Sequence, residues 1–151
     1  MPRSLVLLVP VCLVATLVGC APSKGDIDKS IKEEMKTSLG LDITSTDLTK
    51  KADGGYTGTA TAANGDVYDV EVEPSKSGKA EWKAVPSKPT VEKMVREMID
   101  NQIKIKVKSL DLSKQGFGSY TGTATLENGQ KMKVTGTMEG KNLNLKADPI
   151  P

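Results

Sequence analysis

Apolar residues recur at intervals of four in two separate stretches of the chain. They are Ile27, Ile31, Met35 and Leu39 in the first stretch, and Val91, Val95, Ile99 and Ile103 in the second. This spacing places the side chains on one face of a helix, with Lys and Glu over the rest. The pattern predicts two amphipathic helices, with Asp26 and Thr90 as N-caps and Gly40 as the stop of the first.

Each predicted helix is followed by an alternation of apolar and polar residues, which is typical of half-buried strands. "IKIKVKSLDL" at 103–112 alternates in this way, and "YTGTATAANGDVYDVEV" at 56–72 and "YTGTATLENGQKMKVTG" at 120–136 indicate hairpins. Asn64-Gly65 and Asn128-Gly129 suit two-residue type I′ turns at the hairpin tips. A last strand, 80–85 or 142–147, ends before a proline, so each helix precedes about four antiparallel strands.

A two-residue turn also determines which side chains share a face of the sheet. In the first hairpin it places Thr57, Thr59 and Thr61 with Tyr68, Val70 and Val72, on the face expected to meet the helix. In the second it places Thr121, Thr123 and Thr125 with Met132 and Val134. The opposite faces are then expected to carry Tyr56, Gly58, Ala60, Asp69, Glu71 and Glu73 in the first hairpin, and Tyr120, Gly122, Ala124, Lys131, Lys133 and Thr135 in the second.

The two stretches are copies of one unit. "YTGTAT" occurs at 56–61 and again 64 residues later at 120–125, and the same offset aligns both helices and both Asn-Gly pairs. Such a series in register indicates duplication. The predicted fold class is α+β with two tandem repeats, repeat 1 at 26–85 and repeat 2 at 90–151. They are joined by a linker at 86–89 within the proline-containing "VPSKPT".

The first twenty residues have the character of an export signal. Arg3 precedes an apolar run from Leu5 to Val18, which is too short for a comfortable transmembrane helix. The run ends in Leu17-Val18-Gly19-Cys20, which resembles the lipobox of bacterial lipoproteins. The resemblance implies a signal peptide at 1–19, a lipid-modified Cys20 and a short linker to residue 25. An ordinary signal peptide cut between Cys20 and Ala21 is the alternative.

Composition limits the chemistry of the exported part. The chain has no His, and Cys12, the one cysteine besides Cys20, lies within the predicted signal peptide. This removes the commonest general base and metal ligand, and leaves no thiol for a disulfide or zinc site. "DGGY" and "ANGD" lack the spacing of an EF-hand. We therefore expect no metal, no cofactor and no enzymatic activity. Basic residues are not interleaved with aromatic ones, so no nucleic acid partner is expected.

Charge differs between the repeats. Residues 24–87 hold 9 Lys against 12 Asp and Glu, a net of −3, while residues 88–151 hold 11 Lys and Arg against 7 Asp and Glu, a net of +4. Period two places Lys104, Lys106 and Lys108 on one strand face, and Lys131 and Lys133 on another. These five lysines are the candidate anion-binding residues. The alternative is that they only keep the sheet solvated.

A helix followed by a four-stranded antiparallel sheet resembles the cystatin-like arrangement and the tandem small modules of exported lipoproteins, including PepSY-like domains and tandem-repeat enzyme inhibitors. The cystatin inhibitory pattern Q-x-V-x-G is not met, because Met132 stands where Gln is required. The alternating threonines are too few for an ice-binding solenoid. The sequence thus predicts a bacterial cell-envelope lipoprotein, anchored through Cys20 in the outer membrane if the cell has two membranes. Its expected role is binding or accessory, with an anionic or protein partner. The alternative is an inhibitor or sensor that presents its sheets to a protein.

Overall fold

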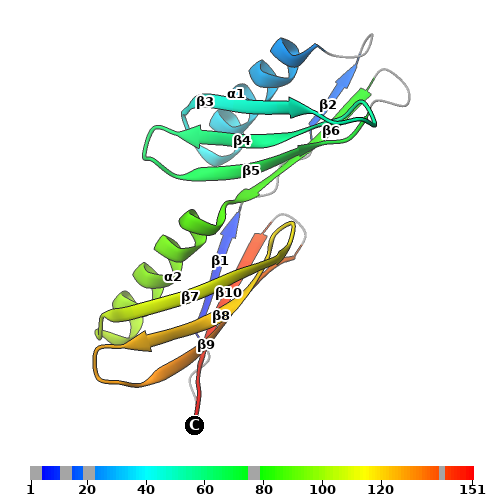
Figure 1. The fold of residues 1–151 in the computed structure, drawn as a ribbon. Coiled ribbons are helices and arrows are strands. Elements are labelled where there is room, and N and C mark those ends of the chain that lie inside the picture. The colour runs from blue at the N-terminus through cyan, green and yellow to red at the C-terminus, as the bar shows by residue number, and fades with distance from the viewer. Residues whose placement is uncertain (1–4, 11–14, 19–22, 75–78, 140–141) are drawn as a thin grey trace. The chain divides into compact units, whose positions relative to one another are not determined.

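The structure is a computed structural model that describes residues 5–10, 15–18, 23–74, 79–139 and 142–151. The chain divides into two compact units. The repeat-1 unit comprises Val11–Ser87, and the repeat-2 unit comprises Met1–Pro10 with Lys88–Pro151. In each unit one helix packs on one face of an antiparallel sheet (Figure 1). The predicted α+β fold with two tandem repeats is confirmed.

The repeat-1 unit consists of α1 (Lys24–Leu39), β3 (Ile43–Lys50), β4 (Tyr56–Ala62), β5 (Val67–Val72) and β6 (Lys79–Pro86). Its sheet has the order β2-β6-β5-β4-β3, where β2 (Ala15–Val18) comes from the N-terminal segment. Strands that follow one another along the repeat are therefore neighbours in the sheet. The four strands after the helix form a simple meander, as consecutive hairpins do.

The repeat-2 unit consists of α2 (Lys88–Ile103), β7 (Val107–Gly116), β8 (Ser119–Leu126), β9 (Lys131–Glu139) and β10 (Asn142–Pro149). Its sheet order is β1-β10-β9-β8-β7, and β1 (Leu5–Pro10) again comes from the N-terminal segment. Only Ser87 separates the end of β6 from the start of α2. The other residues of the predicted linker at 86–89 therefore lie in the ends of these two elements.

The ends of α1 follow local chemistry. Ser23, not Asp26, is the N-cap: its hydroxyl accepts from the Asp26 backbone N–H, and the Asp26 carboxylate accepts from the Ser23 N–H, which completes a capping box. Gly40 ends the helix in the left-handed conformation with φ 66°, as predicted. The predicted N-cap Thr90 is instead buried in the first turn of α2.

Both Asn-Gly pairs lie at hairpin tips, but the turns are not of type I′. Only the glycines have positive φ, 85° at Gly65 and 84° at Gly129. The Ala62 N–H donates to the Asp66 carbonyl, and Leu126 does the same with Gln130. Each connection is a three-residue loop with glycine in the left-handed position, the usual alternative to the two-residue turn.

One extra loop residue reverses the predicted faces of β4 and β8. Ala60 pairs with Tyr68 and Thr59 with Asp69, where the prediction had paired the threonines with the apolar side of β5. In both repeats the Tyr, Gly and Ala of "YTGTAT" therefore face the helix and the threonines face outward. The assignment of β5 and β9 was right: Val70 and Val134 are buried, and Lys131 and Lys133 are exposed.

The core of each unit lies between the helix stripe and the inner face of the sheet. In repeat 1 it contains Ile27, Ile31, Met35, Leu48, Ala60, Tyr68, Val70, Val72, Trp82 and Ala84. In repeat 2 it contains Val91, Val95, Ile99, Leu112, Tyr120, Ala124, Leu126, Met132, Val134, Leu143, Leu145 and Ala147. Burial of these side chains supplies the main driving force for folding, and it explains the apolar period in both helices.

The strand predicted from "IKIKVKSLDL" begins later than expected. α2 continues through Ile103, and β7 begins at Val107, so Lys104 and Lys106 lie in the connection between them. The register of β7 on β8 then shifts between Val107 and Ser109, which places Lys108 at a bulge. The prediction that Lys104, Lys106 and Lys108 alternate along one strand is wrong.

The N-terminal segment contributes an edge strand to each sheet. β1 pairs antiparallel with β10, and β2 pairs antiparallel with β6. Among the residues that the structure describes, no helix is long and apolar enough to cross a membrane. The cleaved, lipid-modified leader remains a prediction, because these observations do not test it.

Candidate functional site

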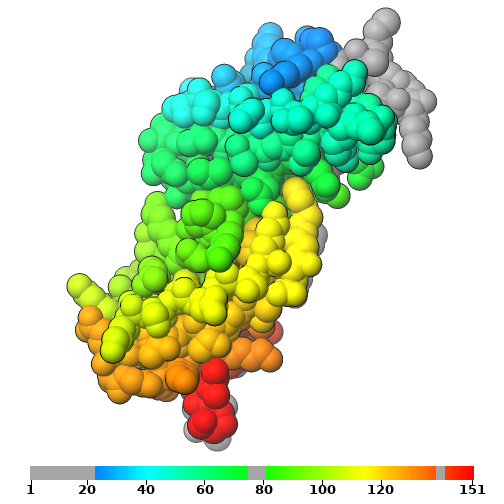
Figure 2. All heavy atoms as spheres, in the orientation of Figure 1, coloured from blue at the N-terminus to red at the C-terminus, as the bar shows by residue number. Residues whose placement is uncertain are grey.

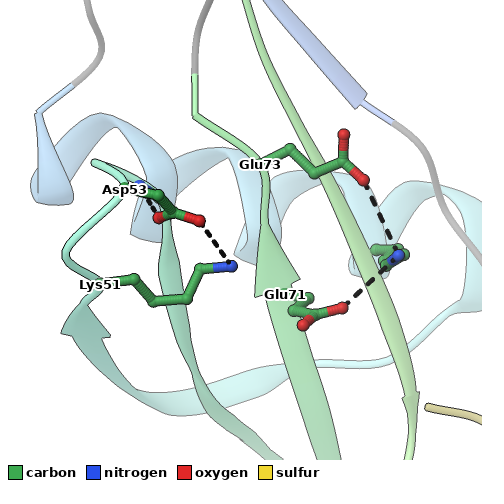
Figure 3. A network of polar contacts seen from close by, with 6 residues as sticks. Lys51, Asp53, Glu71 and Glu73 are labelled. Carbon is green, nitrogen blue, oxygen red and sulfur yellow. Dashed lines mark hydrogen bonds and ion pairs between the residues drawn. The ribbon is translucent and has the colours of Figure 1, made fainter. Parts of the chain in front are cut away.

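The outer face of each sheet, turned away from its helix, carries the polar and charged side chains. In repeat 1 the outer face carries Glu71 on β5 and Glu73 just after it, and Lys83 on β6 lies close to both. Its ammonium group lies 3.5 Å from the Glu71 carboxylate and 3.8 Å from that of Glu73 (Figure 3). Such surface ion pairs contribute little stability, roughly 0–1 kcal/mol each. They do balance the charge of this face locally.

A second contact in Figure 3 joins Lys51 to Asp53 at 3.5 Å, beside the turn that leads into β4. The backbone N–H of Gly55 donates to the Asp53 carboxylate at 2.9 Å. This hydrogen bond, with the nearby Lys51, holds the pKa of Asp53 below its usual range. The turn is therefore stabilised by a carboxylate that is ionised at neutral pH.

In repeat 2 one of the equivalent positions is basic: Lys133 stands where repeat 1 has Asp69, and Lys131 lies two residues before it at the start of β9. Lys131 lies opposite Thr125 and Lys133 opposite Thr123, both across the β8–β9 ladder. Where repeat 1 has the acidic Glu71 and Glu73, repeat 2 has threonines, at 135 and 137. Across the sheet Lys133 is also opposite Asp148 on β10, and Thr123 is opposite Asp111 on β7. This part of the face therefore carries both signs of charge.

The other candidate lysines lie close to the β8–β9 hairpin, at one end of the same sheet. The Lys106 carbonyl accepts from the Glu127 backbone N–H at 3.0 Å, which joins the connection after α2 to the hairpin. Arg96 secures the same region by donating to the Val107 carbonyl at 3.1 Å. Figure 2 shows the end of α2, coloured yellow-green, beside the orange hairpin at the surface of this unit. We call Lys104, Lys106, Lys108 and Lys131 the lysine end.

Lys104 has an unusual backbone conformation. Its φ is 63°, and it is the only residue other than glycine with a positive φ in the part of the chain that the structure describes. The 64-residue offset aligns Lys104 with Gly40, the left-handed cap of α1 at φ 66°. An L residue with a Cβ pays roughly 1–2 kcal/mol for this conformation, whereas glycine does not. Repeat 2 thus carries a strained lysine where the ordinary cap is glycine.

None of the five candidate lysines forms an ion pair with any residue that the structure describes, in contrast to Lys83 in repeat 1. All five are exposed. Cys20, the predicted lipidation site, lies outside the described residues. Within the described ranges, no group of three or more His, Cys, Asp or Glu is placed to hold a metal ion.

Sequence reasoning missed one surface. On the two strands after each helix five outward positions are identical between repeats: Ser45 and Ser109, Asp47 and Asp111, Thr57 and Thr121, Thr59 and Thr123, Thr61 and Thr125. A sixth, Thr49, corresponds to Ser113 and keeps its hydroxyl group. We call this set the hydroxyl face. These side chains are exposed or half-buried. The repeated "YTGTAT" could have indicated this surface. A two-residue turn, however, predicts that its threonines face the core, and the loop has three residues.

Comparison with known proteins found no matching family model, no matching curated protein and no matching solved structure.

Proposed function

We propose that the protein is an exported lipoprotein, anchored through Cys20 in the cell envelope, with a non-enzymatic binding or accessory role. Its lysine end and Lys133 engage an anionic envelope component, such as a lipid head-group or an acidic glycan. In a cell with two membranes it resides in the outer one. The lipobox-like Leu17–Cys20 after an apolar run supports the anchor.

The observation that carries the anion-binding part is the conformation of Lys104. Strained residues persist where the surroundings hold them in place, and they cluster at functional sites. A glycine would serve the same cap without strain, as Gly40 does in α1. Lys104 also places an ammonium group at the C-terminus of α2, beside lysines that have no ion-pair partner among the described residues. The strain is explained if the charge at this position has a role.

Lipid anchoring is tested by metabolic labelling with a fatty acid. The wild type is expected to incorporate the label and to lose residues 1–19, whereas Cys20→Ser is expected to do neither. Each buried methylene contributes about 0.8 kcal/mol to membrane association, so several acyl chains hold the protein firmly. A Cys20→Ser variant that retains the label would contradict the anchor.

Anion binding is tested with anionic and neutral vesicles, using full-length chain with Cys20→Ser so that lipid does not drive association. The test variant changes Lys104, Lys106, Lys108, Lys131 and Lys133 to Gln. A matched control removes the same charge from exposed positions of repeat 1: Lys24, Lys29, Lys32, Lys36 and Lys50.

Each lysine near an anionic surface contributes about 1 kcal/mol, and the attraction weakens as salt screens it. We therefore expect the control variant to bind at low salt and the test variant not to bind. Equal binding of both variants would show that the five lysines only solubilise the sheet.

A second candidate function is supported by the hydroxyl face. Five outward positions have stayed identical between the repeats, while the outward residues of β5 and β9 have diverged in charge. Both units therefore offer the same pair of strands, which suits an inhibitor or sensor that presents its sheets to a protein. Binding of an envelope protein that is lost in Thr121→Asp with Thr123→Asp, and kept in the five-lysine variant, would favour this candidate.

A further inference from the structure

β1 lies at the edge of the repeat-2 sheet. It pairs antiparallel with β10 over six residues, from Leu5 opposite Ala147 to Pro10 opposite Asn142. On its other side it contacts α2, so it lies between the helix and β10 (Figure 1). β2 has the same position between α1 and β6 in the repeat-1 unit. Each sheet thus ends in a strand that comes from upstream of Cys20.

The backbone groups of β10 that face β1 follow from the β9–β10 register. The Ile150 N–H donates to the Lys131 carbonyl at 2.9 Å, so the even-numbered residues of β10 direct their backbone groups toward β9. In an antiparallel strand successive residues alternate between the two neighbours. The N–H and C=O groups of Leu143, Leu145 and Ala147 therefore point to β1, opposite Val9, Leu7 and Leu5.

The fit of β1 to this edge is incomplete at one position. The side-chain oxygen Oδ1 of Asn144 is buried and has no hydrogen-bond partner in the described part of the chain. Across the ladder it is opposite Leu8, a residue type without a side-chain donor. A buried polar atom left unpaired is destabilising. An extended segment with a donor at this position would satisfy the edge better than the chain's own leader.

We propose that the edge of β10 is a strand-docking site in the processed protein. Its occupant is an extended, mainly apolar segment of an envelope protein, which adds antiparallel to β10 beside α2 and places a hydrogen-bond donor opposite Asn144. The inference rests on the proposed removal of residues 1–19, which withdraws β1 and leaves three N–H and three C=O groups unpaired at the edge. An open edge of this kind is a template for strand addition, and the leader itself demonstrates that the site accepts an apolar strand.

The experiment uses the processed protein, purified from the envelope in detergent, with its mass measured to confirm that it begins at Cys20. The probe is a synthetic peptide with the sequence of Leu5–Pro10, flanked by lysines for solubility. We expect saturable binding, with slower hydrogen exchange at the amides of Leu143, Leu145 and Ala147. A peptide with Leu8→Thr supplies the missing donor and is expected to bind about fivefold more tightly.

Two N-methylated peptides give a matched control. Methylation of the Leu7 amide removes a group that faces β10, and is expected to weaken binding at least about tenfold. Methylation of the Leu8 amide, which faces away, is expected to change binding little. The full-length Cys20→Ser chain retains β1 and should bind no probe.

The outcomes separate the two proposals. An envelope protein that still carries residues 1–19 would refute the processing, and with it both the lipoprotein function and the open edge. A protein that begins at Cys20 but binds no peptide would refute the docking site alone. Equal binding of the two N-methylated peptides would also refute it, because association would then not follow the β10 register.

Discussion

The backbone carbonyl of Asp111 on β7 lies directly against Gly122 on β8. A Cβ at Gly122 would come within 2.9 Å of both the Asp111 carbonyl carbon and the Leu112 Cα, and closer still to the carbonyl oxygen. Asp47 and Gly58 have the same relationship in repeat 1. Contacts this short do not occur for real side chains, so the two strands must separate to admit a methyl group.

We therefore predict that Gly122→Ala and Gly58→Ala each lower the free energy of unfolding by roughly 1–3 kcal/mol, the usual range for overpacking. Chemical denaturation followed by circular dichroism measures the change. Gly116→Ala is the control, because nothing lies within 4 Å of its added Cβ and its φ is not positive. If Gly116→Ala destabilised as much as Gly122→Ala, the close approach would not be the cause.

The strain at Lys104 predicts that stability and binding change in opposite directions. Lys104→Gly relieves the left-handed conformation and should raise the free energy of unfolding by about 1 kcal/mol. The same variant should bind anionic vesicles less tightly at low salt, by about fivefold for one lysine near the surface. Gly40→Lys introduces the strain into α1 and should destabilise by a similar amount. Lys104→Gly with unchanged stability would show that the residue is not strained.

Trp82 reports on the repeat-1 unit because it is the single tryptophan, it is buried, and its indole Nε1 donates to the Ser30 hydroxyl at 3.3 Å. Ser30→Ala leaves the indole N–H without this acceptor, and should lower the free energy of unfolding by about 1 kcal/mol as measured by tryptophan fluorescence. Ser38→Ala, at an exposed position of the same helix, shares the gain in helix propensity but removes no such bond. Equal stability of the two variants would contradict the hydrogen bond's contribution.

Tyr68 predicts an alkaline limit to stability. Burial, with a smaller effect from nearby Asp66, raises the pKa of Tyr68 from 10.0 to about 12. The pKa is higher in the folded protein than in the unfolded chain, so folding favours the neutral phenol. Its contribution to the free energy of unfolding is complete below pH 10 and is lost as pH rises through 12. A shift of this size corresponds to on the order of 2 kcal/mol. Denaturation midpoints of the wild type should fall over this range, while those of Tyr68→Phe should fall less.

The duplicated helix-plus-sheet unit could be predicted because local periodicity determines it. The apolar stripe of Ile27, Ile31 and Met35 is a property of the sequence, and so is an Asn-Gly pair between two alternating runs. Neither depends on contacts between distant residues. Gly40 as a helix stop is similarly local, since few other residues adopt its backbone conformation without strain.

The faces of β4 and β8 were mispredicted because a hairpin's register depends on the length of its loop, and Asn-Gly is compatible with two lengths. A difference of one residue exchanges Thr59 for Ala60 on the inner face. Lys104 was mispredicted for another reason. Ile103 completes the helical stripe and also begins an alternating run, so one residue fits both periods. Only packing against the sheet decides between them.

Pro86 and Pro149 end the last strand of each repeat, and both occupy positions whose backbone groups point away from the preceding strand. Proline has no N–H, so the last donor at the outer edge of β10 is that of Ala147. A strand that pairs with this side of β10 therefore ends its pairing at Ala147, as β1 does. A proline at the end of the last strand thus limits how far a neighbouring strand can extend along the sheet, which is one of the ways in which natural proteins restrain edge-to-edge aggregation.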